Sequence, residues 1–291
     1  MKPNIQFLAE RAALLRELRA FFDARQFVEV QPPCLSRDCV VDPYIDPLQI
    51  QSDQFNLPAH RLPDRFFLQT SPESAMKRML AAGSPSIYSL GPVFRAGELG
   101  AMHNVEFTML EWYDVGADMK SAVALLGDLA AQILSKPGCD VTTYRELFQQ
   151  HVSLDPIESS VDDLIDRVGH LDAALTRSLG QDRDSMLDVL MSEVIQPHLG
   201  WQQPVIVTDY PLSQAALAKA SATDPQCAAR FELFASGVEL ANGYDELLDA
   251  NVLVERAKTA NQKRIASGRS PLPAETLLVT AMRGDATQDS L

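Results

Sequence analysis

Two apolar, β-prone segments flank a short polar stretch in the first half of the chain, and this pattern constrains the fold most strongly. The segment IYSLGPVF (87–94) precedes RAGELGAMHN, whose two glycines suit a turn, and VEFTMLEWY (105–113) follows it. Apolar segments on either side of a turn are typical of an antiparallel hairpin. The sequence therefore predicts a hairpin over residues 87–113 with a long polar loop.

The second strand of this hairpin has an unusual face. Side chains alternate between the two faces of a strand, so one face carries Val105, Phe107, Met109, Glu111 and Tyr113. Arg95 stands at the end of the facing strand, and His103 and Asn104 close the loop. An aromatic ring, an arginine fork and an amide suit the base and phosphates of a nucleotide. A solvated hairpin with a surface salt bridge fits the spacing equally well.

Carboxylates mark two further stretches. In SPE (71–73), Glu73 falls in the first turn of a predicted helix. A favourable contact with the helix dipole, worth ~0.3–1 kcal/mol, explains it as well as a binding role does. The stretch GVELANGYDEL (237–247) begins a few residues after Glu232. Spaced carboxylates on a sheet can hold a hard cation, but polar residues on a half-exposed strand explain the pattern more simply.

Signals for helices and strands alternate along the chain and predict a mixed α+β fold. Helices are predicted over residues 6–23, 72–82, 118–136, about 183–199, and before Gly268. Strands are predicted over residues 27–33, 65–70 and 205–208, and on both sides of a turn at Gly237 within 230–242. Only weak signals occur between the helices of the middle region.

Composition excludes several classes of protein. The 291 residues carry a net charge of 25 − 39 = −14, which opposes non-specific binding to nucleic acid phosphates. The four cysteines form no C-x-x-C pair, so we expect free thiols rather than a zinc site. The sequence has no apolar run of the ~20 residues that cross a bilayer. We therefore expect a cytoplasmic protein with no membrane partner.

Four segments resemble, in the right order, the motifs of class II aminoacyl-tRNA synthetases of the lysyl branch. FRAGELGAMHNVEFTMLEWY (94–113) resembles motif 2, and RAFFDARQFVEVQPPCLS (19–36) resembles motif 1. TSPE (70–73) is similar to the substrate loop of that branch, and GVELANGYDEL to the segment before motif 3. Within this class, YPLSQAALA (210–218) and the FRAGE form of motif 2 resemble the elongation factor P lysine ligases.

The resemblance implies one catalytic domain over residues 1–291, an α+β fold with an antiparallel sheet flanked by helices. Its parts would be motif 1 (about 15–36), motif 2 (about 87–115), a helical insertion (about 116–203) and a segment before motif 3 (about 228–267). It also implies that the protein is an enzyme. It would use ATP and Mg²⁺ to activate (R)-β-lysine or lysine as an adenylate. It would then transfer the amino acid to a lysine side chain of elongation factor P.

The resemblance also implies individual roles. Arg95 would be catalytic, in contact with the α-phosphate and the substrate carboxylate. The ATP-binding residues would be Arg95, Glu98, His103, Asn104, Phe107, Glu239 and Leu240. The residues that bind the amino acid would be Ser71, Glu73, Glu111, Tyr113, Asn242 and Glu246. Glu232 and Glu239 would hold Mg²⁺.

The resemblance further implies a homodimer through motif 1 and no tRNA partner, because motif 1 begins too early for an anticodon-binding domain to precede it. Glu98 stands near the place of the usual Asn-Glu pair, which is Ala96 and Gly97 in this sequence. The chain stops at GDATQDSL (284–291), where the family continues into motif 3. We therefore expect a C-terminally truncated fold and a weak or inactive ligase.

Two alternatives stay open on the sequence. One is a non-catalytic synthetase-like module that binds lysine, nucleotide or a protein partner. The other, less favoured, is a lysyl-tRNA synthetase. Exchange of pyrophosphate into ATP in the presence of lysine separates the ligase from the binding module, and a gel shift with tRNA tests the synthetase.

Overall fold

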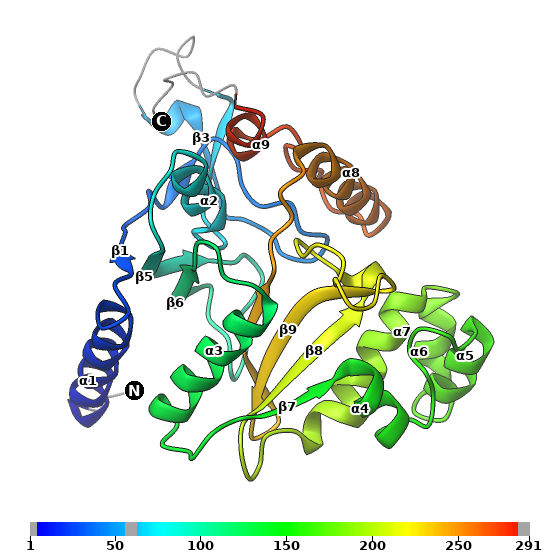
Figure 1. Cartoon of the computed structure of the whole chain (residues 1–291). Coiled ribbons are helices and arrows are strands. Elements are labelled where there is room, and N and C mark those ends of the chain that lie inside the picture. Colours follow the sequence, from blue (N-terminus) through cyan, green and yellow to red (C-terminus); the bar gives the residue numbers. More distant parts are fainter. Residues whose placement is uncertain (1–4, 56–62, 285–291) are drawn as a thin grey trace. The chain divides into compact units, whose positions relative to one another are not determined.

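The computed structural model describes residues 5–55 and 63–284, which form two compact units (Figure 1). The first unit comprises residues 1–116 and 248–291, and the second comprises residues 117–247. Each unit is described by itself below. Residues 285–291, on which the expectation of a C-terminally truncated fold depends, lie outside the described residues. In the described ranges no helix has the length and apolar character needed to span a membrane.

The first unit contains two small sheets. One sheet has the order β1 (Val28–Glu29), β5 (Ile87–Phe94) and β6 (Glu106–Tyr113). The other has the order β2 (Leu35–Ser36), β4 (Arg65–Leu68) and β3 (Gln49–Gln51). Strands β5 and β6 pair in antiparallel fashion, with Val93 opposite Phe107 and Ile87 opposite Tyr113. The predicted hairpin is therefore confirmed, whereas the strand predicted over 27–33 is only two residues long.

The helices of this unit agree with the predicted positions, except for the short last one, over residues 277–282, which was not predicted. They are α1 (Ile5–Asp23), α2 (Glu73–Ala81), α8 (Ala250–Ala266) and α9 (Leu277–Met282), with a short 3₁₀ turn η1 (Ser52–Phe55). The last turn of α1 buries Phe21 and Phe22, and the Phe22 ring stacks 4.8 Å from the ring of Tyr88 in β5. Gly268 follows α8 with a φ of 78°, as expected of a helix C-terminus.

The second unit is built on a four-stranded sheet. Its order is β10 (Val238–Tyr244), β9 (Cys227–Ala235), β8 (Val205–Pro211) and β7 (Asp140–Thr143). Strand β9 pairs in antiparallel fashion with both β8 and β10, and Glu232 lies opposite Asn242. Ser236 and Gly237 turn the chain between β9 and β10 with φ angles of 52° and 76°. The turn predicted at Gly237 is thus confirmed, and among the described strands β10 forms one edge of this sheet.

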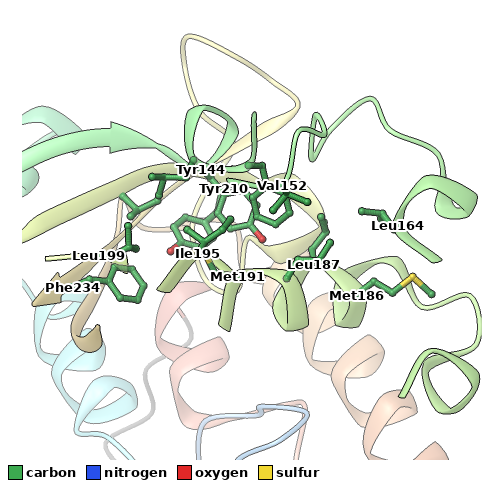
Figure 2. Packing of buried hydrophobic residues seen from close by; sticks show 14 of the residues in the cluster. Tyr144, Val152, Leu164, Met186, Leu187, Met191, Ile195, Leu199, Tyr210 and Phe234 are labelled. Atoms are coloured by element: carbon green, nitrogen blue, oxygen red, sulfur yellow. The ribbon is translucent and has the colours of Figure 1, made fainter. Parts of the chain in front are cut away.

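Helices cover both faces of this sheet. They are α3 (Met119–Ile133), α4 (Tyr144–His151), α5 (Val161–Gly169), α6 (Ala173–Leu179) and α7 (Arg183–Leu190), followed by the helical turns Met191–Ile195 and Gln196–His198 and, after β8, by Leu212–Gln214. Gly127 of α3 lies against Ile206 on one face of β8. Val205 and Val207 point to the other face, into a core shared with α4, α5 and α7. Figure 2 shows this core, in which the rings of Tyr144 and Tyr210 lie 4.7 Å apart.

Three helices of this unit, α4 to α6, had only weak signals in the sequence. Two of them begin with a reciprocal capping box, in which the side chain of Thr143 accepts from the Glu146 N–H and that of Ser160 accepts from the Asp163 N–H. Each of these acidic side chains accepts in return from the N–H of its cap residue. The predicted α+β class, with largely antiparallel sheets flanked by helices, is confirmed.

Candidate functional site

Arg95 lies at the start of the hairpin loop, close to two other residues predicted to bind ATP. The carbon of its guanidinium group is 5.2 Å from the centre of the Phe107 ring, and its Nη1 is 3.8 Å from Oε2 of Glu98. Its Nε donates to the buried carbonyl of Thr70 at 3.3 Å. The side chain is 24% exposed. The structure therefore places a partly shielded cation beside an aromatic face, an arrangement that suits a phosphate attached to a planar base.

Backbone contacts hold Arg95 in this position. Its N–H donates to the Val105 carbonyl at 2.9 Å, and the next N–H, of Ala96, donates to the Asp46 carbonyl at 2.8 Å. The carboxylate of Asp46 in turn accepts from Arg264 and Arg269. Residues far apart in the sequence thus fix the start of the hairpin loop.

His103 and Asn104 are exposed at the other end of this loop. The Asn104 Oδ1 accepts from the N–H of Val105 at 3.0 Å, and the His103 carbonyl accepts from the N–H of Gly100 at 3.1 Å. The two residues shape the loop and present their side chains at its surface. Within residues 5–55 and 63–284, no hydrogen bond or ion pair joins either side chain to the group formed by Arg95, Glu98 and Phe107.

A second group in the first unit gathers residues that were predicted to bind the amino acid. The hydroxyl of Tyr113 donates to Oε1 of Glu111 at 2.9 Å on β6. Glu73, in the first turn of α2, pairs with Lys77 one turn further along at 2.5 Å. The Nζ of Lys77 lies 5.8 Å from the centre of the Tyr113 ring. Ser71 is half-buried in the loop just before α2.

In the second unit, Glu232 is buried in a polar network of its own. Its Oε1 accepts from Nη2 of Arg230 at 2.5 Å, and its Oε2 accepts from the hydroxyl of Tyr210 at 2.6 Å. Burial and the neighbouring carboxylate both raise the pKa of Tyr210 well above its usual value. Burial, the largest single effect, lowers the pKa of Arg230. The charge of Glu232, the nearby Tyr244 and Tyr210 and the hydrogen bond to Glu232 together outweigh it, so the net shift is upward. Tyr210 therefore stays a donor, and Arg230 stays charged, near neutral pH.

Strand β10 carries the other predicted residues of the second unit. Glu239, Leu240 and Asn242 are exposed on it, and Nδ2 of Asn242 donates to Oε1 of Glu239 at 3.4 Å. Gly243 is needed on this strand, because a Cβ there would come within 2.3 Å of the buried Phe231 ring. Glu246 follows the strand and forms a β-bridge with Ala218. This bridge joins the predicted segment 237–247 to the YPLSQAALA stretch.

The donor set of the second unit fits Mg²⁺ in part. Carboxylate oxygens are the ligands that Mg²⁺ prefers, and a nucleotide-bound ion usually takes only one or two from the protein. Glu239 offers an exposed carboxylate. Each oxygen of Glu232 already accepts one hydrogen bond and retains a second lone pair. The described residues contain no group of three His, Cys, Asp or Glu side chains able to hold a metal ion.

Three residues of these groups were missed in the sequence, namely Lys77, Arg230 and Tyr210. Sequence spacing could have identified Lys77 and Arg230. Lys77 is four residues after Glu73 on a predicted helix, a spacing that brings side chains together, and Arg230 is two residues before Glu232 on one strand face. Tyr210 contacts Glu232 across the β8–β9 pairing, which spacing alone does not reveal.

The described contacts thus join predicted residues around Arg95 and around Glu73 and Tyr113 in the first unit, and along β9 and β10 in the second. A model of class II tRNA synthetases (D, K and N) matches residues 2–271 of the chain. The chain therefore belongs to the class II tRNA synthetase family.

Within that family, the chain is similar to ligases that act on a translation factor. It is 38% identical over 280 residues to the elongation factor P–(R)-β-lysine ligase of Enterobacter sp. (strain 638), an alignment that covers 96% of this chain and 85% of that protein. The ligases of the same name from Salmonella arizonae and Salmonella gallinarum are each 37% identical, over 280 and 279 residues, with the same coverage. The resemblance found in the sequence is therefore confirmed.

Proposed function

We propose that this protein uses ATP to activate (R)-β-lysine or lysine as an aminoacyl-adenylate and transfers the amino acid to a lysine side chain of elongation factor P. One observation carries the proposal. Arg95, Glu98 and Phe107 lie together on the motif 2 hairpin of a chain that is 37–38% identical to such ligases. A cation beside an aromatic face suits the two parts of ATP that an adenylating enzyme must hold.

Residues of the first unit have the following roles in this proposal. Arg95 contacts the α-phosphate and the carboxylate that attacks it, and so offsets the negative charge that develops as the new bond forms. The Phe107 ring lies against adenine, while Glu98, His103 and Asn104 contact other parts of ATP. Glu73 binds one ammonium group of the amino acid. Glu111 and Tyr113 bind the other, and Ser71 lines the pocket.

Residues of the second unit have roles of their own in this proposal. Asn242 contacts the carboxylate of the amino acid, Glu246 contacts an ammonium group, and Leu240 contacts ATP. Glu239 would hold Mg²⁺, and Glu232 would contribute through the lone pairs that Arg230 and Tyr210 leave available. When bound, Mg²⁺ neutralises phosphate charge and helps pyrophosphate to leave.

The proposal includes the protein's partners. Elongation factor P is the acceptor and tRNA is not, so the reaction belongs to the cytoplasm, where translation takes place. We also propose a homodimer formed through α1. The first turns of this helix expose Ile5, Phe7 and Leu8, which are 78%, 65% and 62% accessible, and an exposed apolar surface of this kind is typical of a protein interface.

Exchange of labelled pyrophosphate into ATP tests the first step. We expect exchange that depends on lysine or (R)-β-lysine and that falls strongly in Glu246→Ala, because this variant lacks the carboxylate that contacts the ammonium group. The β-bridge at Glu246 uses only the backbone, so the fold should survive the change. Glu255→Ala is the matched control, since this carboxylate lies on the exposed face of α8. Binding of ATP and the amino acid without pyrophosphate exchange would instead indicate a synthetase-like binding module.

Mass spectrometry of elongation factor P tests the second step. A mass increase equal to one lysyl group on the factor, with ATP and the amino acid present, is the expected result. Incubation with tRNA under the same conditions gives the comparison. Charging of tRNA with no change in the factor would replace the proposal with a lysyl-tRNA synthetase.

A further inference from the structure

The ion pair between Lys77 and Glu73 on α2 is unusually shielded for a pair formed within one helix. The Nζ of Lys77 lies 2.5 Å from Oε1 of Glu73, and the two side chains are only 14% and 13% exposed. The Lys258–Glu255 pair on α8 is a useful contrast, because its side chains are 57% and 71% exposed. Exposed pairs of that kind contribute little, whereas a shielded carboxylate requires a cation beside it.

The same ammonium group also faces an aromatic ring from another element. Its nitrogen lies 5.8 Å from the centre of the Tyr113 ring on β6, within the range of a cation–π contact. The hydroxyl of that ring donates to Glu111. Lys77 therefore places an ammonium group against a carboxylate and an aromatic face, the two kinds of partner that the ammonium groups of a diamino acid need.

We propose that Lys77 is a specificity-determining residue whose ammonium group occupies the substrate's ammonium position in the substrate-free protein and is displaced when the amino acid binds. This inference rests on the proposed function, because it takes Glu73 and Tyr113 as part of the amino acid pocket. The flexible four-carbon stem of a lysine lets its ammonium group leave the pair. The pocket is thus kept neutralised while it waits for substrate.

The displacement selects for a cationic ligand. An incoming ammonium group replaces Lys77 as the partner of Glu73, so the shielded carboxylate is never left alone. An amino acid with an apolar side chain brings no second cation, and its binding would either strand Glu73 or collide with the Lys77–Glu73 pair. The ion pair therefore acts as a competitor that only a substrate with a suitably placed amino group overcomes.

Replacement of Lys77 by Met separates this role from a structural one. The variant keeps the length and apolar stem of the side chain but removes the competing charge. We expect (R)-β-lysine or lysine to bind Lys77→Met roughly tenfold more tightly than wild type, since two like charges no longer share one carboxylate. The ligand-free variant should melt at a lower temperature than wild type and show a larger increase when the amino acid is added.

Isothermal titration with lysine and with (R)-β-lysine measures this effect. Lys77→Gln serves as a second neutral variant if the Met variant does not fold. Lys77→Arg keeps the charge and should not bind the amino acid more tightly than wild type. Lys258→Met, which removes the exposed lysine on α8, should bind it with the affinity of wild type. Unchanged or weaker binding by folded neutral variants would overturn the inference and leave the proposed function intact. If wild type binds neither amino acid, the proposed function fails, and this inference fails with it.

Discussion

The guanidinium group of Arg230 lies 2.5 Å from the carboxylate of Glu232, two residues further along the same strand, and only 8% of the Glu232 side chain reaches solvent. The same guanidinium group donates through Nη1 to the Gln214 carbonyl at 2.6 Å and lies 4.7 Å from the centre of the Tyr210 ring. The pair thus joins β9 to β8 and to the turn that follows it. It also neutralises Glu232 in a place that water hardly reaches.

Arg230→Met should destabilise the second unit strongly. It leaves the Glu232 carboxylate buried without its cation, and loss of one partner from a buried pair costs about 3–5 kcal/mol. Urea denaturation measures the change. The double variant Arg230→Met with Glu232→Gln should recover much of the loss, because it removes the stranded charge as well. A single variant as stable as wild type would show that Glu232 does not depend on Arg230.

Arg264 has a comparable role in the first unit, and Arg269 is its matched control. The Arg264 side chain is 2% exposed and donates to the carbonyls of Asp42, Ile45 and Ser270 and to the carboxylate of Asp46. Arg264→Met should lower the free energy of unfolding by about 3 kcal/mol, because these acceptors lose their buried donors. Arg269→Met, which removes a half-exposed contact to the same Asp46, should cost less than about 1 kcal/mol.

Arg264→Met should also weaken ATP binding. The Asp46 carbonyl accepts from the N–H of Ala96, next to Arg95, so loss of Arg264 frees the segment that positions the phosphate-binding guanidinium group. Titration of the folded variant with ATP at a temperature well below its melting point measures this. Equal ATP affinities in Arg264→Met and Arg269→Met would show that the contact between Arg264 and Asp46 does not affect nucleotide binding.

Local patterns were enough to predict the hairpin and to suggest that Arg95 and Phe107 lie near each other, whereas Glu98 was assigned from the family resemblance. Strand alternation places Phe107, Glu111 and Tyr113 on one face, and a loop brings Arg95 and Glu98 together because they are three residues apart. The strands on both sides of Gly237 were predictable for the same reason. In each case the deciding contacts lie within one hairpin.

Short helices with long-range partners could not be predicted in this way. Helices α4 to α6 have seven to nine residues each, which is too short for a stable isolated helix. Their stability comes from burying side chains such as Phe148 and Leu164 in the core of the second unit. The contact between Tyr210 and Glu232 depends on the register of two strands joined by a long connection. Such contacts follow from packing and are not visible in local spacing.

Arg95→Ala tests the hairpin assignment directly. A charge-assisted hydrogen bond to phosphate contributes about 1.5–3 kcal/mol, so ATP affinity should fall roughly 10-fold to 150-fold. Lysine affinity, measured without nucleotide, should change far less. Arg11→Ala is the control, because it removes an exposed hydrogen bond from α1 to Thr108 of the same hairpin. A loss of lysine affinity with ATP affinity unchanged would contradict the role given to Arg95.

The stacked imidazoles of His151 and His198 should make the stability of the second unit depend on pH. Their ring centres are 5.4 Å apart and the rings are nearly parallel. Burial, and then the neighbouring His198, lower the pKa of His151 below its usual value. In the unfolded chain this residue takes up a proton near pH 6.5. Because the unfolded state then binds more protons than the folded state, stability falls as the pH drops below about 6.5.

The melting temperature of His151→Gln, followed from pH 7.5 to pH 5.5, tests this dependence. The variant should lose less stability than wild type over this range, because the group that the fold keeps neutral is gone. His198→Gln should show an intermediate slope, since it removes the neighbouring ring but leaves His151 partly buried. His170→Gln, at an exposed position in the same unit, provides the control and should follow wild type. Identical slopes for wild type and His151→Gln would show that protonation of this stacked pair has no effect on folding.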